Sequence, residues 1–259
     1  MKKALRITLL SILALATLAV STILYFCNKS ARQVTTCNGK IRVEFSDDYR
    51  FITSRDIIKT VKAEYGPLAG IRIDSVDLKR VENILGRISA VQKGDAFVTR
   101  DGYLNLRVSQ RQPFLRFQKG SIGFYADKSG FIFPLQERYT LSVPVIDGNI
   151  PLSEGGRFKG RPETPGERKW LDGIIAMVSY MEDSRDWKDR IVQIHVVSAQ
   201  DIILVPRAGK EKFIFGGPGG YEAKLARMEQ YYKSIAPNFE EGYYSTVDVR
   251  VKGQVICRK

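Results

Sequence analysis

The sequence predicts an α+β fold: a single N-terminal transmembrane helix, then a β-α-α-β-β module, then a mainly antiparallel β domain with flanking helices. Three observations support this prediction. Residues 7–26 carry no charge, two helical patterns lie among strand patterns over 39–113, and short strand patterns dominate from Phe114 onward. The expected parts are a cytoplasmic tail (1–6), a transmembrane helix (7–27), a linker (28–38), the first module (39–113) and the C-terminal β domain (114–259).

The apolar run at 7–26 is long enough to cross a bilayer as a helix. Such a helix extends about 30 Å, the thickness of the hydrocarbon core, and backbone groups in lipid must pair internally. Lys2, Lys3 and Arg6 precede the run and favour a cytoplasmic N-terminus. We therefore predict a single-pass type II protein of the cell inner membrane, with its bulk in the periplasm. A signal peptide cleaved near 19–21 is the alternative, but the apolar run continues past that site.

Residues 39–113 have the pattern of a compact module with two helices and three strands. The expected elements are a strand at 41–45, helices opening near Ser54 and Leu78, and strands at 91–98 and 103–110. Asp101-Gly102 is the hairpin signal between the last two strands. Two short helices packed on a three-stranded sheet would bury the apolar faces of all five elements.

The region from Phe114 onward is expected to be built mainly from short strands. The predicted strands are 115–118, 122–126, 131–134, 143–147, 191–197, 201–205, 212–215, 245–251 and 254–257. Thr164-Pro165-Gly166-Glu167 predicts a helix start, with a capping residue, a proline in the first turn and an acid at the third position. A last helix is predicted from Tyr221. We interpret this region as one α+β domain with a mainly antiparallel sheet.

Composition predicts a folded protein with a basic surface. The chain of 259 residues is 44% hydrophobic and has a formal net charge of +13. Its lysines and arginines are scattered, and its aromatic residues form no stacking motif, so we predict no nucleic-acid partner.

The three cysteines have no metal-binding spacing. Cys27 borders the predicted membrane span. Cys37 and Cys257 would both lie in the periplasm, where disulfides persist. They are a candidate disulfide, which would tie the start of the folded region to its end.

The sequence contains no recognisable catalytic constellation. His195 is the only histidine, and it alternates with apolar neighbours on a predicted strand, so we interpret it as a surface or packed residue. Gly216–Gly220 lacks the Gly-Lys-Ser/Thr of a phosphate loop and is typical of a strand-to-helix turn. No Gly-x-Ser-x-Gly elbow is present. We therefore predict no enzymatic activity, no metal and no cofactor.

Three stretches together carry a family resemblance. Residues 100–113 form an amphipathic strand followed by a basic residue and a proline, 125–134 have the pattern of a hairpin, and 247–251 read Val-Asp-Val-Arg-Val. In this order, after an apolar N-terminal run, the chain resembles the FtsQ/DivIB cell-division protein family over its whole length. Its ending at 254–259 resembles the Bacteroidetes-type branch.

This resemblance implies a POTRA domain at 39–113 and a partner-binding β domain beyond it. It further implies a non-catalytic scaffold of the bacterial divisome at the septum. Such a scaffold recruits FtsB/FtsL-like partners by strand addition to its C-terminal edge strand, because a partner strand satisfies the unpaired backbone groups of an edge. The POTRA domain would bind other divisome proteins. By motif, the docking strand comprises Arg250, Val251, Lys252, Gly253, Gln254, Val255 and Ile256.

Val251 stands where the family usually has a tyrosine, so the aromatic side chain expected at the interface is missing.

Two other functions fit parts of the pattern. A POTRA-containing envelope-assembly module that guides polypeptides is the main alternative. A periplasmic hydrolase with an unfamiliar site is the other, and it requires convergent acids in a deep pocket.

Overall fold

The computed structural model describes residues 15–26, 36–47, 51–135, 142–153 and 159–259. They form an α+β structure with one three-stranded and one nine-stranded sheet. The chain divides into two compact units. The first contains the chain up to Glu44 with residues 54–85 and 94–107, and the second contains 45–53, 86–93 and 108–259. The predicted domain boundaries at 38/39 and 113/114 stay predictions.

The predicted transmembrane helix is overturned by the structure. Residues 15–26 are helical and exposed, whereas residues 7–14 and 27 of the predicted span lie outside the described residues. No helix among the described residues is long and apolar enough to cross a membrane. The prediction of a transmembrane helix at 7–27 is therefore corrected. The predicted tail (1–6) and most of the predicted linker lie outside the described residues.

The β-α-α-β-β order predicted for the first module is confirmed. Its elements are β1 (Ile41–Phe45), α2 (Ser54–Tyr65), a 3-10 turn (Ile73–Ser75), α3 (Leu78–Arg87), β2 (Val91–Val98) and β3 (Leu104–Gln110), with sheet order β1-β3-β2. Leu104 N–H donates to Lys40 O at 3.1 Å, and Ser46 N–H donates to Val108 O at 3.0 Å. Both partners advance along the chain, so β1 and β3 run parallel.

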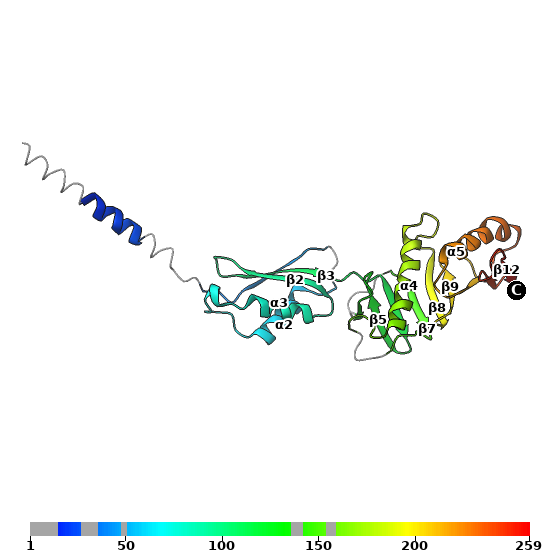
Figure 1. Ribbon diagram of the computed structural model, residues 1–259, viewed down its shortest axis with the longest axis horizontal. Helices are drawn as coiled ribbons and strands as arrows, with labels where there is room; N and C mark the ends of the chain where they lie inside the picture. Colours follow the sequence, from blue (N-terminus) through cyan, green and yellow to red (C-terminus); the bar gives the residue numbers. More distant parts are fainter. Residues whose placement is uncertain (1–14, 27–35, 48–50, 136–141, 154–158) are drawn as a thin grey trace, which may run out of the picture. The chain divides into compact units, whose positions relative to one another are not determined.

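The central strand β3 carries the apolar side chains that the two helices cover. Figure 1 shows α2 and α3 lying beside β2 and β3. The helices bury residues at helical spacing and β3 buries residues at alternate positions: Ile57, Val61, Val81, Ile84, Leu85, Leu104, Leu106 and Val108. The Tyr65 hydroxyl at the end of α2 accepts the Asp77 N–H before α3 at 2.9 Å. This hydrogen bond ties the two helices together.

The nine-stranded sheet contains all the remaining strands. They are β4 (Leu115–Lys119), β5 (Ile122–Ala126), β6 (Ile132–Pro134), β7 (Val145–Gly148), β8 (Ile191–Ser198), β9 (Asp201–Pro206), β10 (Lys212–Gly216), β11 (Thr246–Asp248) and β12 (Ile256–Arg258). Their order in the sheet is β12-β11-β10-β9-β8-β7-β4-β5-β6. Most predicted strands of this region are confirmed to within two residues at either end, whereas the two C-terminal strands are shorter than predicted.

The sheet is mixed: among the described residues five of its eight strand pairs are antiparallel, in keeping with the predicted mainly antiparallel domain, and three are parallel. The pairs β4–β7, β7–β8 and β10–β11 are parallel. Helix α4 (Pro165–Asp183) connects β7 to β8, and α5 (Tyr221–Gln230) leads from β10 toward β11. A helical crossover between neighbouring strands returns the chain to the same end of the sheet, so these strands must run parallel.

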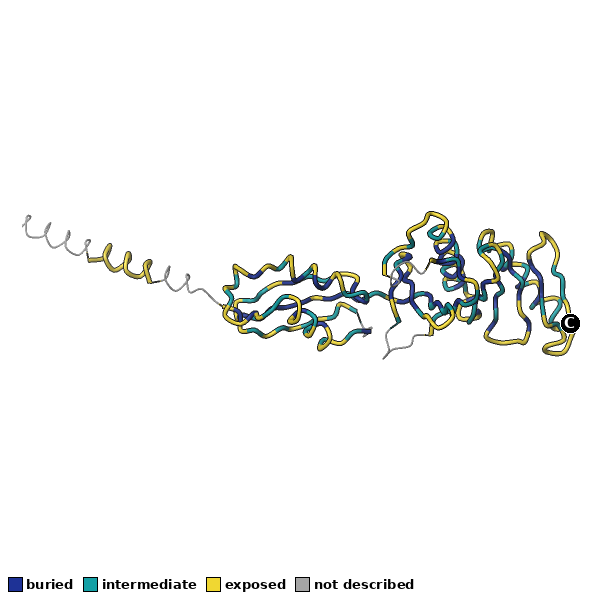
Figure 2. The backbone as a smooth tube through the Cα atoms, turned by 90° about the horizontal axis from the view of Figure 1, so that it is seen from below, coloured by how far each residue is buried: buried dark blue, intermediate teal, exposed yellow. Residues whose placement is uncertain are grey.

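Both helices lie on one face of the sheet and share one core with it. Apolar residues of α4 and α5 belong to the same buried cluster as alternate residues of the strands (Figure 1). Figure 2 shows buried residues along the strands and on α4. Helix α4 begins with the predicted capping box, in which Thr164 and Glu167 exchange hydrogen bonds. Helix α5 begins after Gly220, whose φ of 61° follows from the tight strand-to-helix turn.

Replacing Phe117 by alanine should strongly destabilise the second unit. Phe117 on β4 and Phe124 on β5 are both fully buried, and their rings stack at 4.9 Å with an interplanar angle of 9°. Loss of the ring leaves a cavity, which costs about 3–5 kcal/mol. Urea unfolding of the full chain, followed on the transition of this unit, measures the change. Ile122→Ala on β5, where Ile122 is 38% exposed, is the control, and an equal loss in both variants would contradict the prediction.

Candidate functional site

Two short strands form one edge of the nine-stranded sheet. Strand β11 pairs parallel with β10, and β12 pairs antiparallel with β11. In the part of the chain that the structure describes, no strand pairs with the outer side of β12. The end of the chain, marked C in Figure 2, lies among half-buried and exposed residues. This edge is where the sequence places the docking strand.

Backbone groups of β11 alternate between its two neighbours. Lys212 N–H donates to Ser245 O at 2.9 Å, and Val249 N–H donates to Ile214 O at 3.1 Å. In a parallel pair alternate residues bond to the same neighbour. Val247 and Val249 therefore direct their ladder groups at β10, as does the C=O of Ser245, and Thr246 and Asp248 direct theirs at β12.

This alternation determines which groups of β12 face outward. Thr246 lies opposite Arg258, and Asp248 lies opposite Ile256. Arg258 and Ile256 therefore use their N–H and C=O groups in pairing with β11. Because successive residues of a strand alternate in direction, the N–H and C=O of Cys257 point toward the open edge. A partner strand could pair with them.

The turn after β11 is held by an ion pair between the buried Asp248 and the exposed Arg250. Asp248 is only 4% exposed. Its carboxylate accepts from Arg250 Nη2 at 2.7 Å, from Arg250 Nε at 3.0 Å and from the Arg250 backbone N–H at 3.0 Å. Arg250 also lies 3.7 Å from Asp201 on β9. The hydrogen bonds from Arg250 hold the pKa of Asp248 below its ordinary value, and Asp248 raises the pKa of Arg250.

This ion pair explains why β11 is shorter than predicted. The Asp248 side chain binds the N–H of Arg250 and takes it out of the strand ladder. The chain then turns, with Gln254 N–H donating to Val251 O at 3.3 Å and Gly253 at a φ of 74°. Positive φ is a conformation that glycine adopts without strain.

The structure therefore divides the seven candidate docking residues among different environments. Ile256 lies in β12, and Val255 directly before it packs partly against the core. Residues 250–254 form the connecting turn instead of a strand. In this turn the Val251 side chain is 42% exposed, whereas Arg250 is engaged by Asp248.

The cysteines of the candidate disulfide are free thiols in the structure. Cys37 is buried and Cys257 is half-buried. Burial raises the pKa of both thiols. Cys27 lies outside the described residues. The pairing of Cys37 with Cys257 stays a prediction.

His195 lies on the exposed part of the sheet surface with a carboxylate beside it. Its Nδ1 is 2.8 Å from Asp147 Oδ1, and Gln193 Nε2 donates to Asp147 Oδ2 at 2.7 Å. Side chains on neighbouring strands β7 and β8 thus form a cross-strand polar cluster. Asp147 could not be predicted as the partner of His195, because the two residues are far apart in the sequence. Among the described residues no group of three or more His, Cys, Asp or Glu side chains is placed to hold a metal ion.

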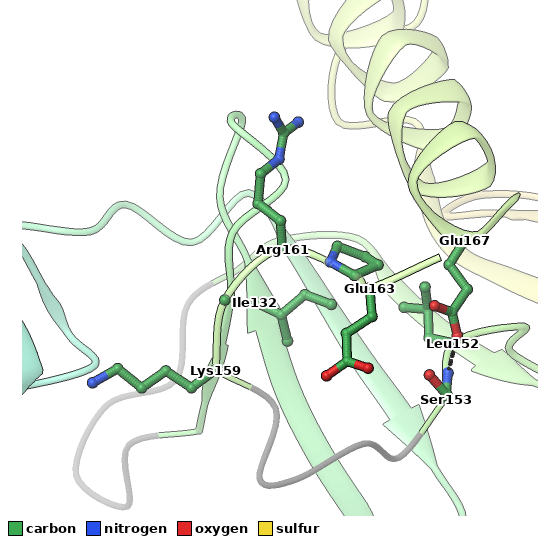
Figure 3. A pocket seen from close by; sticks show the side chains of 9 residues that line it. Ile132, Leu152, Ser153, Lys159, Arg161, Glu163 and Glu167 are labelled. Carbon is green, nitrogen blue, oxygen red and sulfur yellow. Dashed lines mark hydrogen bonds between the residues drawn. The ribbon is translucent and has the colours of Figure 1, made fainter. Parts of the chain in front are cut away.

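A small pocket at the start of α4 is lined by four charged residues: Lys159, Arg161, Glu163 and Glu167. Figure 3 shows Lys159 and Arg161 extending away from Glu167, and Glu167 bonded to Ser153. Glu167 Oε1 accepts the Ser153 N–H at 2.5 Å, and its Oε2 accepts from the Thr164 hydroxyl at 2.9 Å. Hydrogen bonds from Ser153, the largest cause, and from Thr164 lower the pKa of Glu167 to about 2. These bonds mark Glu167 as a structural cap.

These features define a class of protein. It is an α+β chain with an open sheet edge at its C-terminal strand. Of the side chains discussed above, Glu167 caps a helix, Asp248 and Arg250 hold a turn, and Asp147 and His195 make a cross-strand contact. Residues 112–258 match the family model described as FtsQ/DivIB, C-terminal related. The match covers more than half of the chain, so the protein belongs to the FtsQ/DivIB family.

Family membership supports a role in cell division. Proteins of this family are generally not enzymes, and they interact with other division proteins. The family also implies a membrane protein of the division septum, although the described residues contain no helix able to span a membrane. A comparison with curated proteins found no match.

The stability contributed by Glu167 should depend on pH. Its folded pKa of about 2 lies below the ordinary value of 4.5, so its contribution is fully present above pH 4.5 and is lost as the pH falls toward 2. The free energy of unfolding of the native chain and of Glu167→Gln should therefore differ most above pH 5 and converge in acid. Urea titrations at several pH values measure this difference. Glu163→Gln at the same pocket is the control, and a constant difference across the range would contradict the prediction.

Proposed function

We propose that the protein is a non-catalytic scaffold of the bacterial divisome that recruits FtsB/FtsL-like partners by strand addition to β12. It would act on the periplasmic side of the division septum. Membership of the FtsQ/DivIB family supports the division role. The observation that carries the docking mode is the open outer side of β12, toward which the N–H and C=O of Cys257 point.

Strand addition requires an edge with unpaired backbone groups, and the two edges of this sheet differ in this respect. At the β6 edge, Ile132 and Gly160 exchange two backbone hydrogen bonds of 2.8 and 3.0 Å. At the β12 edge, no such bridge is present among the described residues. An uncovered edge strand is a template for pairing with another chain. The proposal therefore uses β12 and not β6.

The seven candidate residues would then have different roles. Val255 and Ile256 would contribute to the strand on which the partner docks, and the exposed turn with Val251 would contact the partner beside it. Arg250 would act as a positioning residue, because its guanidinium is held by Asp248. We further propose that the β-α-α-β-β module at 39–113 is a POTRA domain that binds other division proteins, and that 114–259 form the docking domain.

If the partner docks on β12, removing one outward N–H should weaken the binding of the partner. In Cys257→Pro the ring removes the N–H that points to the open edge, and proline is tolerated on edge strands. Binding of a purified FtsB-like partner to the full chain, measured by biolayer interferometry, should weaken about two- to tenfold, the range for one lost hydrogen bond. Cys257→Ala is the matched control, because it loses the thiol and keeps the N–H.

Two results separate docking from misfolding. Thermal unfolding must show that Cys257→Pro retains the folded sheet. Unchanged affinity in the folded proline variant would overturn strand addition at β12, as would an equal loss in Cys257→Ala.

A further inference from the structure

An aromatic pocket lies beside the start of β11, next to the sheet edge that the docking mode uses. Its cavity measures about 460 Å³. The walls and floor of the aromatic pocket are Tyr231, Tyr232, Phe239, Tyr243, Tyr244 and Glu211. Glu240 and Glu241 lie at its rim. The pocket therefore combines ring faces with carboxylates, in a protein whose net charge is +13.

The rings form one packed group with accessible outer members. Phe239 stacks on Tyr243 at 4.7 Å, and Tyr244 meets both rings edge-on at 5.1 and 4.9 Å. Phe239 and Tyr243 are 42% and 40% exposed. Exposed apolar side chains that gather in one patch, unlike single ones, are a mark of an interaction surface.

Glu211 is a buried carboxylate without a cation. It is only 5% exposed. It shares a hydrogen bond with the Tyr232 hydroxyl, and no ion pair to it is found in the part of the chain that the structure describes. The pKa of the neighbouring Tyr232 hydroxyl is raised, mainly by burial and next by its hydrogen bond to the Glu211 carboxylate. A buried charge is costly unless it is paired. The floor of the pocket is therefore complementary to a cation.

The aromatic rings already contact cations at the edges of the pocket. Lys259 Nζ lies 4.4 Å from the centroid of the Tyr243 ring, and the Arg190 guanidinium lies 5.5 Å from that of Tyr232. Ring faces attract ammonium and guanidinium groups through their quadrupoles. These contacts leave the Glu211 carboxylate with the Tyr232 hydroxyl as its partner and without a cation.

The pocket adjoins the open edge of the sheet. Tyr244 directly precedes Ser245, whose N–H donates to Arg258 O on β12 at 2.9 Å. Tyr231 in the pocket wall is close enough for Cys257 of β12 to contribute, after burial and Glu211, to raising its pKa to about 12. A polypeptide paired along β12 would therefore reach the pocket with side chains near one end of its strand.

We propose that the aromatic pocket binds an arginine side chain of the polypeptide that docks on β12. The guanidinium would lie between the ring faces and form a bidentate pair with Glu211, a geometry that arginine provides and lysine does not. The source of the arginine rests on the proposed function, whereas the affinity of the pocket for a guanidinium does not.

Binding of a free arginine derivative tests the pocket directly. The full chain, labelled with ¹³C in its tyrosine rings, is titrated with N-acetyl-arginine methylamide and followed by NMR. We expect saturable shifts of the pocket tyrosines in the millimolar range, the strength of one cation–π contact with one ion pair. N-acetyl-citrulline methylamide, which has the same shape without the charge, should bind at least about fivefold more weakly. Equal binding of the two probes would overturn the proposal.

Substitutions locate the binding. Glu211→Gln should weaken the arginine probe at least about fivefold, and Tyr243→Leu at the exposed wall should weaken it without disturbing the buried floor. Glu222→Gln, an exposed acid on α5, is the matched control and should leave binding unchanged. Binding that survives both pocket variants would overturn the proposal, and Tyr243→Leu keeps this test available if Glu211→Gln fails to fold.

The two proposals fail in different ways. If Cys257→Pro leaves partner affinity unchanged but the arginine probe binds and depends on Glu211, docking on β12 is wrong and the guanidinium site stands. If Cys257→Pro weakens the partner but arginine and citrulline bind alike, docking stands and the inference about the pocket is wrong.

Discussion

Burial of one face of the nine-stranded sheet beneath α4 and α5 is the constraint on which the second unit depends. Both crossovers, β7 to β8 and β10 to β11, step in the same direction across the sheet, and their starting strands run parallel. Because such crossovers are right-handed, both helices must lie on the same face. The shared apolar core of the two helices and the strands is the result.

This one-sided construction leaves the sheet with two edges of different character. The β6 edge carries a bridge to Gly160, whereas β12 is held only from its inner side among the described residues. Asp248 and Arg250 turn the chain between β11 and β12 and so present that edge. Beside it, Glu211 is a second buried carboxylate, but without a cation. One edge of the sheet thus combines unpaired backbone groups with a pocket suited to positive charge.

Much of the local structure could be predicted because its causes are local. The capping box at Thr164 and Glu167, the hairpins and the β-α-α-β-β order follow from residues adjacent in the chain, and all are found. The predicted membrane helix is corrected, because no helix among the described residues is long and apolar enough to cross a membrane. The three parallel pairs of the mixed sheet were not predicted, because alternation marks a strand without identifying its neighbour. Strand β11 ends earlier than predicted because the Asp248 side chain accepts the backbone N–H of Arg250.

The sequence by itself determined the types and order of the elements, and with them the resemblance to the FtsQ/DivIB family that the family match bears out. Only the tertiary structure decided which strand lies at the edge, which backbone groups face outward and which buried acid lacks a cation. Glu211 lies far along the chain from Tyr243, and Asp201 lies far from Arg250. Their proximity arises from sheet pairing, which brings together residues that no local pattern connects.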